Sequence, residues 1–318
     1  MLSGTLRVAL LLAVLSGIRP GPAAAAVENA GAAATPGVEE VVVSAPEPRY
    51  VAPTTRDRIG RIWAPVFVNG KGPFRFVLDT GASRSAFIQR VVDEVGLPVR
   101  PDAVRLRGVT GSAIVSAARV DTLQFGELTI ENTMVPIVAD AFGGADGVLG
   151  GEGLMGKRVH IDFRNDSISI ARSRRAAPPP GYAVVPFRNG PTRGMRIEVM
   201  IGSVKAIGLI DTGAERTVGN LALREALLQH SGGHDRYEDA VIGVTEDIQV
   251  ATRVRIPSVV AGGLIVKNPE IMFSDLYIFD HWQLRSRPAL LIGMDVLGLL
   301  DTLIIDYGSK HLQVRIRN

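Results

Sequence analysis

The same four residues, Asp-Thr-Gly-Ala, occur twice in this sequence, at 79–82 and at 211–214. Each copy directly follows an apolar run, which ends in Val77-Leu78 in the first case and in Leu209-Ile210 in the second. An acid at the end of a buried strand is expected to point its carboxyl group into a water-filled cleft, and the glycine that follows permits a sharp turn. A chain that repeats this arrangement is constrained to fold into two similar halves.

Further landmarks recur in the same order in both halves. A stretch with helical spacing follows each tetrad, at 85–97 and at 220–230. The later matched segments are 107–111 with 242–246, 147–154 with 290–297, and 159–172 with 302–315. This shared order predicts an internal duplication rather than two chance motifs.

The halves are separated by three consecutive prolines, which the interior of a sheet does not accommodate. We therefore expect a first lobe at 57–173, a Pro-rich linker at 174–181 and a second lobe at 182–318. Most segments in both lobes are short, rich in valine and isoleucine, and punctuated by glycine, proline and asparagine. The segment 119–138, for example, predicts a hairpin that turns at Gly126. With one short helix per lobe, the pattern predicts an all-β, barrel-like fold.

The two tetrads, each followed later by an apolar-apolar-glycine element, resemble those of the aspartic peptidases. The alanine in the tetrad resembles the retroviral-type (retropepsin-like) branch, while the duplication within one chain resembles the pepsin-like arrangement. The resemblance covers essentially all of 57–318. It implies two tandem retropepsin-like β-barrel lobes, each with one short helix, related by a pseudo-two-fold axis.

This resemblance implies an aspartic-type endopeptidase whose catalytic dyad is Asp79 and Asp211. Two carboxylates within hydrogen-bonding distance cannot both ionise cheaply, so they share one proton. The ionised member takes a proton from water, while the protonated member polarises the peptide carbonyl. No metal and no cofactor is implied.

The resemblance also assigns supporting roles around the dyad. In the family, the hydroxyl of the tetrad threonine bonds the opposite loop, a role that passes to Thr80 and Thr212. The other residues expected to support the dyad loops are Gly81, Ala82, Gly213 and Ala214. The apolar-apolar-glycine elements that end in Gly150 and Gly293 are expected to pack beneath these loops.

Two segments, 106–120 and 240–254, fall where the family carries flap hairpins that cover a bound peptide. Both contain glycine between strand-like runs, as a mobile cover requires. The flap candidates are Gly108, Val109, Thr110, Gly243, Val244 and Thr245. An extended peptide could pair with such hairpins through its backbone.

Two alternatives remain open at this point. The fold could have lost turnover and serve as a catalytically silent periplasmic peptide-binding protein, because fold alone does not establish activity. The chain could also dimerise and pair Asp79 with its own copy, although the duplication favours a monomer with an internal pseudo-dimer. Glu215, which follows the second tetrad, adds a negative charge near the cleft unless Arg216 or Arg84 neutralises it.

The N-terminus predicts export. Residues 1–26 combine a basic start, an apolar run at 8–18 and four alanines at 23–26, as a secretory signal peptide does. The apolar run is too short to span a bilayer, so no stable membrane span is expected after cleavage; an uncleaved anchor is the alternative. Residues 27–56 are expected to form a flexible leader, whose role as a pro-segment stays open. We therefore expect a periplasmic or secreted protein.

Other functional classes find little support. The net charge is +3 and the basic residues are scattered, which disfavours nucleic-acid binding and leaves a peptide or protein as the expected partner. The segment 151–156 fits the G-x-G-x-x-G dinucleotide pattern, but a strand-like run follows it instead of a helix. His230 and His234 are separated by two glycines, which disfavours a metal site there.

Overall fold

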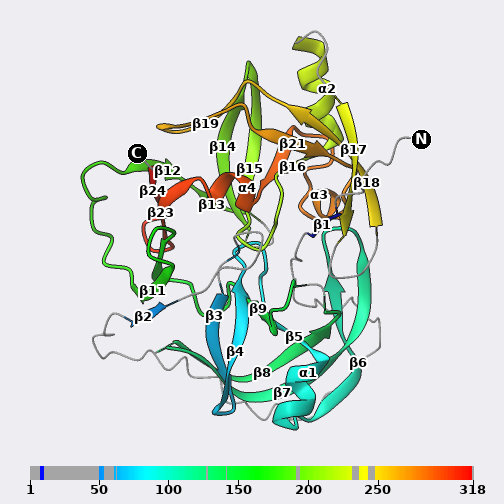
Figure 1. Cartoon of the computed structure of the whole chain (residues 1–318), viewed down its shortest axis with the longest axis vertical. Helices are drawn as coiled ribbons and strands as arrows, with labels where there is room; N and C mark the ends of the chain where they lie inside the picture. Colours follow the sequence, from blue (N-terminus) through cyan, green and yellow to red (C-terminus); the bar gives the residue numbers. More distant parts are fainter. Residues whose placement is uncertain are drawn as a thin grey trace, which may run out of the picture.

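The computed structural model describes residues 8–10, 50–53, 61, 63–126, 128–140, 142–190, 194–230, 236–242 and 248–316. It confirms the predicted fold class, because strands dominate and form two lobes, one below the other in Figure 1. A third sheet lies beside both lobes. No helix in the described part of the chain is long and apolar enough to cross a membrane.

The first lobe is a seven-stranded sheet in the order β3-β4-β9-β5-β8-β7-β6. Its strands are β3 (Trp63–Val68), β4 (Lys71–Leu78), β5 (Ala86–Ile88), β6 (Val99–Arg107), β7 (Ser112–Phe125), β8 (Leu128–Val138) and β9 (Gly147–Leu149). An additional β3–β7 pairing closes six of these strands into a barrel. The predicted hairpin is present, since β7 and β8 join at Gly126.

The helix of this lobe, α1 (Gln89–Val95), is shorter than the predicted stretch 85–97. Residues 86–88 form β5 instead, and that part of the prediction is wrong. All three side chains of β5 are buried, and its backbone pairs with both β8 and β9. A helix there would satisfy its own backbone and leave those two neighbours without this ladder.

The second lobe is an eleven-stranded open sheet in the order β1-β17-β18-β21-β16-β22-β15-β14-β19-β20, with β13 paired to β14. Its strands are β1 (Val8–Leu10), β13 (Arg188–Asn189), β14 (Met195–Ile201), β15 (Val204–Ile210), β16 (Val218–Gly219), β17 (Arg236–Ile242), β18 (Ile248–Arg255), β19 (Ser258–Ala261), β20 (Leu264–Lys267), β21 (Glu270–Phe273) and β22 (Ala289–Ile292). The predicted helix at 220–230 is α2 (Leu221–His230).

The described part of this lobe contains two more helices than expected, α3 (Tyr277–His281) and α4 (Met294–Leu297). The connection that carries α3, residues 274–288, is longer than its counterpart at 139–146 in the first lobe. The extra length lets the chain form a helical turn that buries Ile278 and Phe279.

A six-stranded sheet, β12-β24-β23-β10-β11-β2, joins the lobes (Figure 1). Its strands are β2 (Tyr50–Pro53), β10 (Lys157–Asp162), β11 (Ser167–Arg172), β12 (Ala183–Pro186), β23 (Leu300–Asp306) and β24 (His311–Ile316). The antiparallel ladder between β10 and β23 is the junction of the two halves.

Two short N-terminal segments also take part in sheets. Residues 50–53, within the expected leader, pair with β11 at the edge of the six-stranded sheet. Residues 8–10, within the expected signal segment, pair in parallel with β17. The other residues of 1–56, including the predicted export signal's alanines, lie outside the described part of the chain.

A buried acid supports the junction between the lobes. Asp306 is fully buried, and its Oδ1 accepts hydrogen bonds from Ser173 Oγ (2.5 Å) and from the N–H groups of residues 308 and 309 (3.0 and 2.9 Å). Its Oδ2 lies 3.4 Å from Nη1 of Arg158 on β10. The matching acid of the first lobe, Asp162, accepts hydrogen bonds from its own turn, at 164–165.

We therefore predict that Asp306→Ala lowers the free energy of unfolding by about 3 kcal/mol, because Ser173 Oγ and two backbone N–H groups lose their acceptor and the half-buried Arg158 loses its ion pair. The matched change Asp162→Ala should cost about 1 kcal/mol, since water reaches that turn. Urea unfolding of the two variants checks this. Equal losses would mean that Asp306 does not support the junction.

Candidate active site

The two tetrad acids leave the ends of equivalent central strands. β4 pairs in parallel with β9, and β15 pairs in parallel with β22. The N–H of Asp79 donates to the carbonyl of Leu149 (3.0 Å), and the N–H of Asp211 donates to that of Ile292 (3.0 Å). Each acid is thus anchored by its own backbone at the last bond of a buried parallel ladder.

Each carboxyl group is also held by its own turn. Oδ1 of Asp79 accepts hydrogen bonds from the N–H groups of residues 81 and 82 (2.8 and 2.9 Å). Oδ1 of Asp211 accepts from the N–H groups of residues 213 and 214 (2.9 and 3.0 Å). The inner oxygen of each acid is therefore satisfied, and the orientation of each carboxyl group is fixed.

The two acids meet across the boundary between the lobes. A Cβ on Gly81 would lie 2.5 Å from Oδ2 of Asp211, and one on Gly213 would lie 2.5 Å from Oδ2 of Asp79. The carboxyl groups are close enough to hydrogen-bond each other, and both side chains are fully buried. No donor among the described residues reaches either Oδ2. A proton between the two acids is the contact that this geometry permits.

Burial dominates the electrostatics of the pair. It raises the pKa of Asp79 to about 6, against the opposing effects of the hydrogen bond from Asp211, the two turn amides and the charge of Arg61. Burial and then the negative charge of Asp79 raise the pKa of Asp211 well above its usual value. The pair therefore retains at least one proton over the mildly acidic range.

The tetrad threonines lock the two loops together. Thr80 Oγ1 donates to the carbonyl of Ile210 (2.9 Å), and Thr212 Oγ1 donates to that of Leu78 (2.5 Å). Each hydroxyl also accepts the N–H of the other threonine, both at 3.1 Å. The four bonds are reciprocal, so neither loop can shift without breaking contacts to the other lobe.

Gly150 and Gly293 lie beneath the dyad loops, as expected. A Cβ on Gly150 would lie 2.3 Å from the backbone of Arg84, and one on Gly293 would lie 2.6 Å from that of Arg216. Only glycine permits this approach of two backbones.

A second pair of acids, which we did not identify from the sequence, fixes these same loops. The N–H of Gly293 donates to Thr217 Oγ1 (3.1 Å), which donates to Oδ1 of Asp295 (2.7 Å). In the first lobe the N–H of Gly150 donates to Ser85 Oγ (3.1 Å), and Glu152 accepts the N–H of the same serine. Burial raises the pKa of both Glu152 and Asp295.

A signal for these residues was present in the repeat. A hydroxyl residue follows each tetrad acid by six positions, at 85 and 217. An acid follows each supporting glycine by two positions, at 152 and 295. Aligning the two halves residue by residue would have paired them.

The first flap candidate packs onto the second lobe. The turn between β6 and β7 is closed by the N–H of Gly108 bonding Gly111 O (2.7 Å), and this hairpin reaches up to α3 in Figure 1. Val109 is fully buried, and its carbonyl accepts the N–H of Ile278 (3.1 Å). Thr110 is also buried. The sequence predicts acids facing a water-filled cleft, but both acids are fully buried in this arrangement.

The second flap candidate cannot be compared with the first. Gly243, Val244 and Thr245 lie outside the described residues, between β17 and β18.

Glu215, which follows the second tetrad, lies 3.7 Å from Nε of Arg216. This ion pair partly neutralises the extra negative charge.

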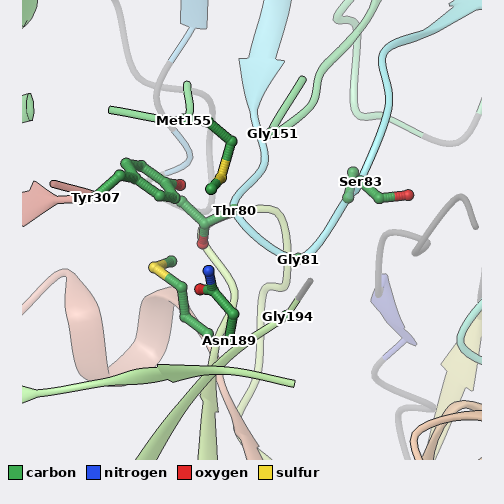
Figure 2. A pocket seen from close by; sticks show the side chains of 10 residues that line it. Thr80, Gly81, Ser83, Gly151, Met155, Asn189, Gly194 and Tyr307 are labelled. Carbon is green, nitrogen blue, oxygen red and sulfur yellow. The ribbon is translucent and has the colours of Figure 1, made fainter. Parts of the chain in front are cut away.

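A pocket opens beside the first dyad loop. Figure 2 shows Met155, Tyr307 and Asn189 gathered around Thr80, while the side chain of Ser83 points away from them. Burial, together with the negative charge of Asp79, raises the pKa of Tyr307.

No group of three His, Asp or Glu side chains in the described part of the chain is placed to hold a metal ion.

Comparison with known families agrees with the repeat. A family model described as an aspartyl protease matches twice, at residues 64–154 and at residues 197–296. Each match contains one tetrad and its supporting glycine. No curated protein matches the chain.

We predict that Thr212→Val destabilises the protein by about 2 kcal/mol, because the isosteric change leaves Leu78 O and the N–H of Thr80 buried without partners. Thr212→Ser keeps the hydroxyl and should cost about 1 kcal/mol, for one lost methyl group. Chemical denaturation of both variants checks the order. A serine variant as unstable as the valine variant would contradict the importance of the hydroxyl.

Proposed function

Because the chain belongs to the aspartyl protease family, we propose that it is an aspartic endopeptidase that hydrolyses peptide bonds with a water molecule held between Asp79 and Asp211. The observation that carries this proposal is the meeting of two buried carboxyl groups whose outer oxygens have no donor but each other among the described residues. A singly protonated pair is both a base and an acid at one place.

The proposed reaction uses both members of the pair. The ionised carboxylate takes one proton from water as the water oxygen bonds to the peptide carbonyl carbon, and the protonated carboxyl gives its proton to the carbonyl oxygen. The resulting gem-diol then collapses: the first acid returns its proton to the leaving nitrogen, and a diol hydroxyl returns a proton to the second acid. The products are a carboxylic acid and an amine, and the dyad regains its single proton.

The surroundings favour this chemistry. Charges that develop during the reaction are stabilised more strongly in a buried site than in water. The four cross-lobe bonds of Thr80 and Thr212 hold the acids in place before substrate arrives, which removes reorganisation from the reaction. The substrate we propose is an extended peptide, paired through its backbone with the flap hairpin.

A second candidate function is a peptide-binding protein without turnover. It is favoured by the docked state of the first flap, in which Val109 is buried against the second lobe and both acids are covered. In this alternative the hairpin holds a peptide but never admits an attacking water. The two functions differ in whether bound peptides are cut.

We further propose that the protein works outside the cytoplasm as a monomer. The composition of residues 1–26 supports export. The pairing of one acid from each half of the same chain supports an internal pseudo-dimer, which needs no second copy.

Asp79→Asn and Asp211→Asn should each reduce peptide cleavage by at least about 1000-fold, since neither variant can share a proton and act as a base. Digestion of a mixed peptide library between pH 4 and pH 7 measures this, with the exposed acid Asp121 as control in Asp121→Asn. Full activity in either dyad variant would disprove the one-chain dyad. Peptide binding by the unmodified protein without cleavage at any pH would favour the binding protein.

The same variants test the buried dyad through stability. Because burial raises the carboxyl pKa values, the folded dyad favours protons, and its contribution to stability is lost as pH rises from about 4 past 6. The melting temperature of the unmodified protein should therefore fall over this range more than that of Asp211→Asn. Parallel pH profiles would show that the pKa values are not raised.

A further inference from the structure

The contacts of the dyad with its own loops are symmetric, but the strands beside it are not. In the first lobe, Trp63 faces Val77 in the antiparallel ladder of β3 and β4. The ladder ends at this pair; extended by two residues in the same register, it would bring Arg61 opposite Asp79. Side chains that lie directly opposite each other in such a ladder emerge on the same face, about 5 Å apart at Cβ.

The equivalent position in the second lobe has no side chain. Arg196 faces Leu209 in the ladder of β14 and β15. The same two-residue step puts Gly194 opposite Asp211. Among the described residues, a Cβ added to Gly194 would meet only the side chain of Leu209, at 3.6 Å.

Arg61 is held firmly where it lies. It is 1% exposed and is among the largest fully buried side chains of the described residues. Its Nη2 donates to the carbonyl of Phe142 (2.7 Å), itself a fully buried residue. A buried guanidinium cannot lose its proton, so it is a permanent positive charge on one side of the dyad.

We propose that Arg61 assigns the roles within the dyad: it holds Asp79 as the ionised carboxylate, and the shared proton therefore resides on Asp211. Arg61 is a positioning residue, because it acts on charge and touches no reacting atom. The assignment rests on the proposed function only for its catalytic meaning: Asp79 would accept the proton of water and Asp211 would protonate the carbonyl oxygen. The distribution of charge itself can be measured without cleavage.

The titration of the groups agrees with this assignment. The charge of Arg61 lowers the pKa of Asp79. Arg61 is not among the groups that shift the pKa of Asp211. Asp79 interacts with Asp211, Arg61 and Tyr307. The negative charge of Asp79 raises the pKa of Asp211 and that of Tyr307. Asp211 and Tyr307 therefore both respond to Asp79 as to a carboxylate.

Single-carboxyl variants give the sharpest test, because one remaining acid has one pKa. In Asp211→Asn only Asp79 titrates, and in Asp79→Asn only Asp211 titrates. Carbon-13 NMR of labelled aspartate carboxyls should give a pKa for Asp79 at least about one unit below that of Asp211. The reverse order, or equal values, would overturn the proposal.

A second change attributes the difference to the arginine. Arg61→Met added to Asp211→Asn should raise the pKa of Asp79 by about one unit or more, while Arg61→Lys should leave it nearly unchanged. When Arg61→Met is combined with Asp79→Asn, the pKa of Asp211 should shift much less. Arg105→Met, which removes an exposed arginine on β6, is the control. If Arg61→Met does not fold, the comparison of the two single-carboxyl variants still decides the assignment.

The outcomes separate this inference from the proposed function. If the unmodified protein cuts peptides but Asp79 does not titrate below Asp211, the roles are assigned wrongly and the dyad stands. If the pKa of Asp79 is below that of Asp211 and no peptide is cut under any condition, Arg61 determines which acid is ionised in a protein that has no turnover. In an active enzyme, Arg61→Met should shift the acidic limb of kcat/KM upward by about one pH unit.

Discussion

The structure brings two buried carboxyl groups together at a place where no other donor from the described residues reaches their outer oxygens. Two like charges at this separation repel strongly in a low-dielectric interior, so the pair is tolerated only with one proton between them. A free chain would relieve the repulsion by moving the acids apart. The rest of the fold prevents this, and each of its main features can be understood as a restraint on that movement.

The restraints act at three levels. Closest to the dyad, the threonine hydroxyls of each loop bond the backbone of the other lobe. One layer beneath, Gly150 and Gly293 press against the loops and are tied to hydroxyl and acidic side chains. Farthest away, the ladder between β10 and β23 joins the lobes into one sheet. The repulsion between the two acids is local, whereas the restraints are distributed along the chain. No single bond therefore has to oppose the whole repulsion.

The sequence predicted those features that depend on the repeat. Strand, acid, turn and supporting glycine follow one another within short segments, so pattern and resemblance located Asp79 and Asp211. It predicted a helix too early at 86–88, because the apolar spacing of that segment fits either structure and only pairing with β8 and β9 decides it. It missed α3, whose connection has no counterpart in the first half. Arg61 could not be identified, because its position beside Asp79 depends on a strand register that no local motif specifies.

Duplication within one chain allows what a symmetric dimer forbids. In a dimer of identical subunits, any charge placed beside one acid is also placed beside the other, and the shared proton has no preferred site. Here each half carries its own substitutions: Arg61 in the first half corresponds to Gly194 in the second, Glu152 corresponds to Asp295, and α3 of the second lobe bonds the first flap at Val109. An enzyme that must use one carboxylate as base and one carboxyl as acid benefits when these roles are set before substrate binds. The asymmetry lies in the layer next to the dyad, where it would act on the reaction proposed above, while the dyad's own bonds remain symmetric.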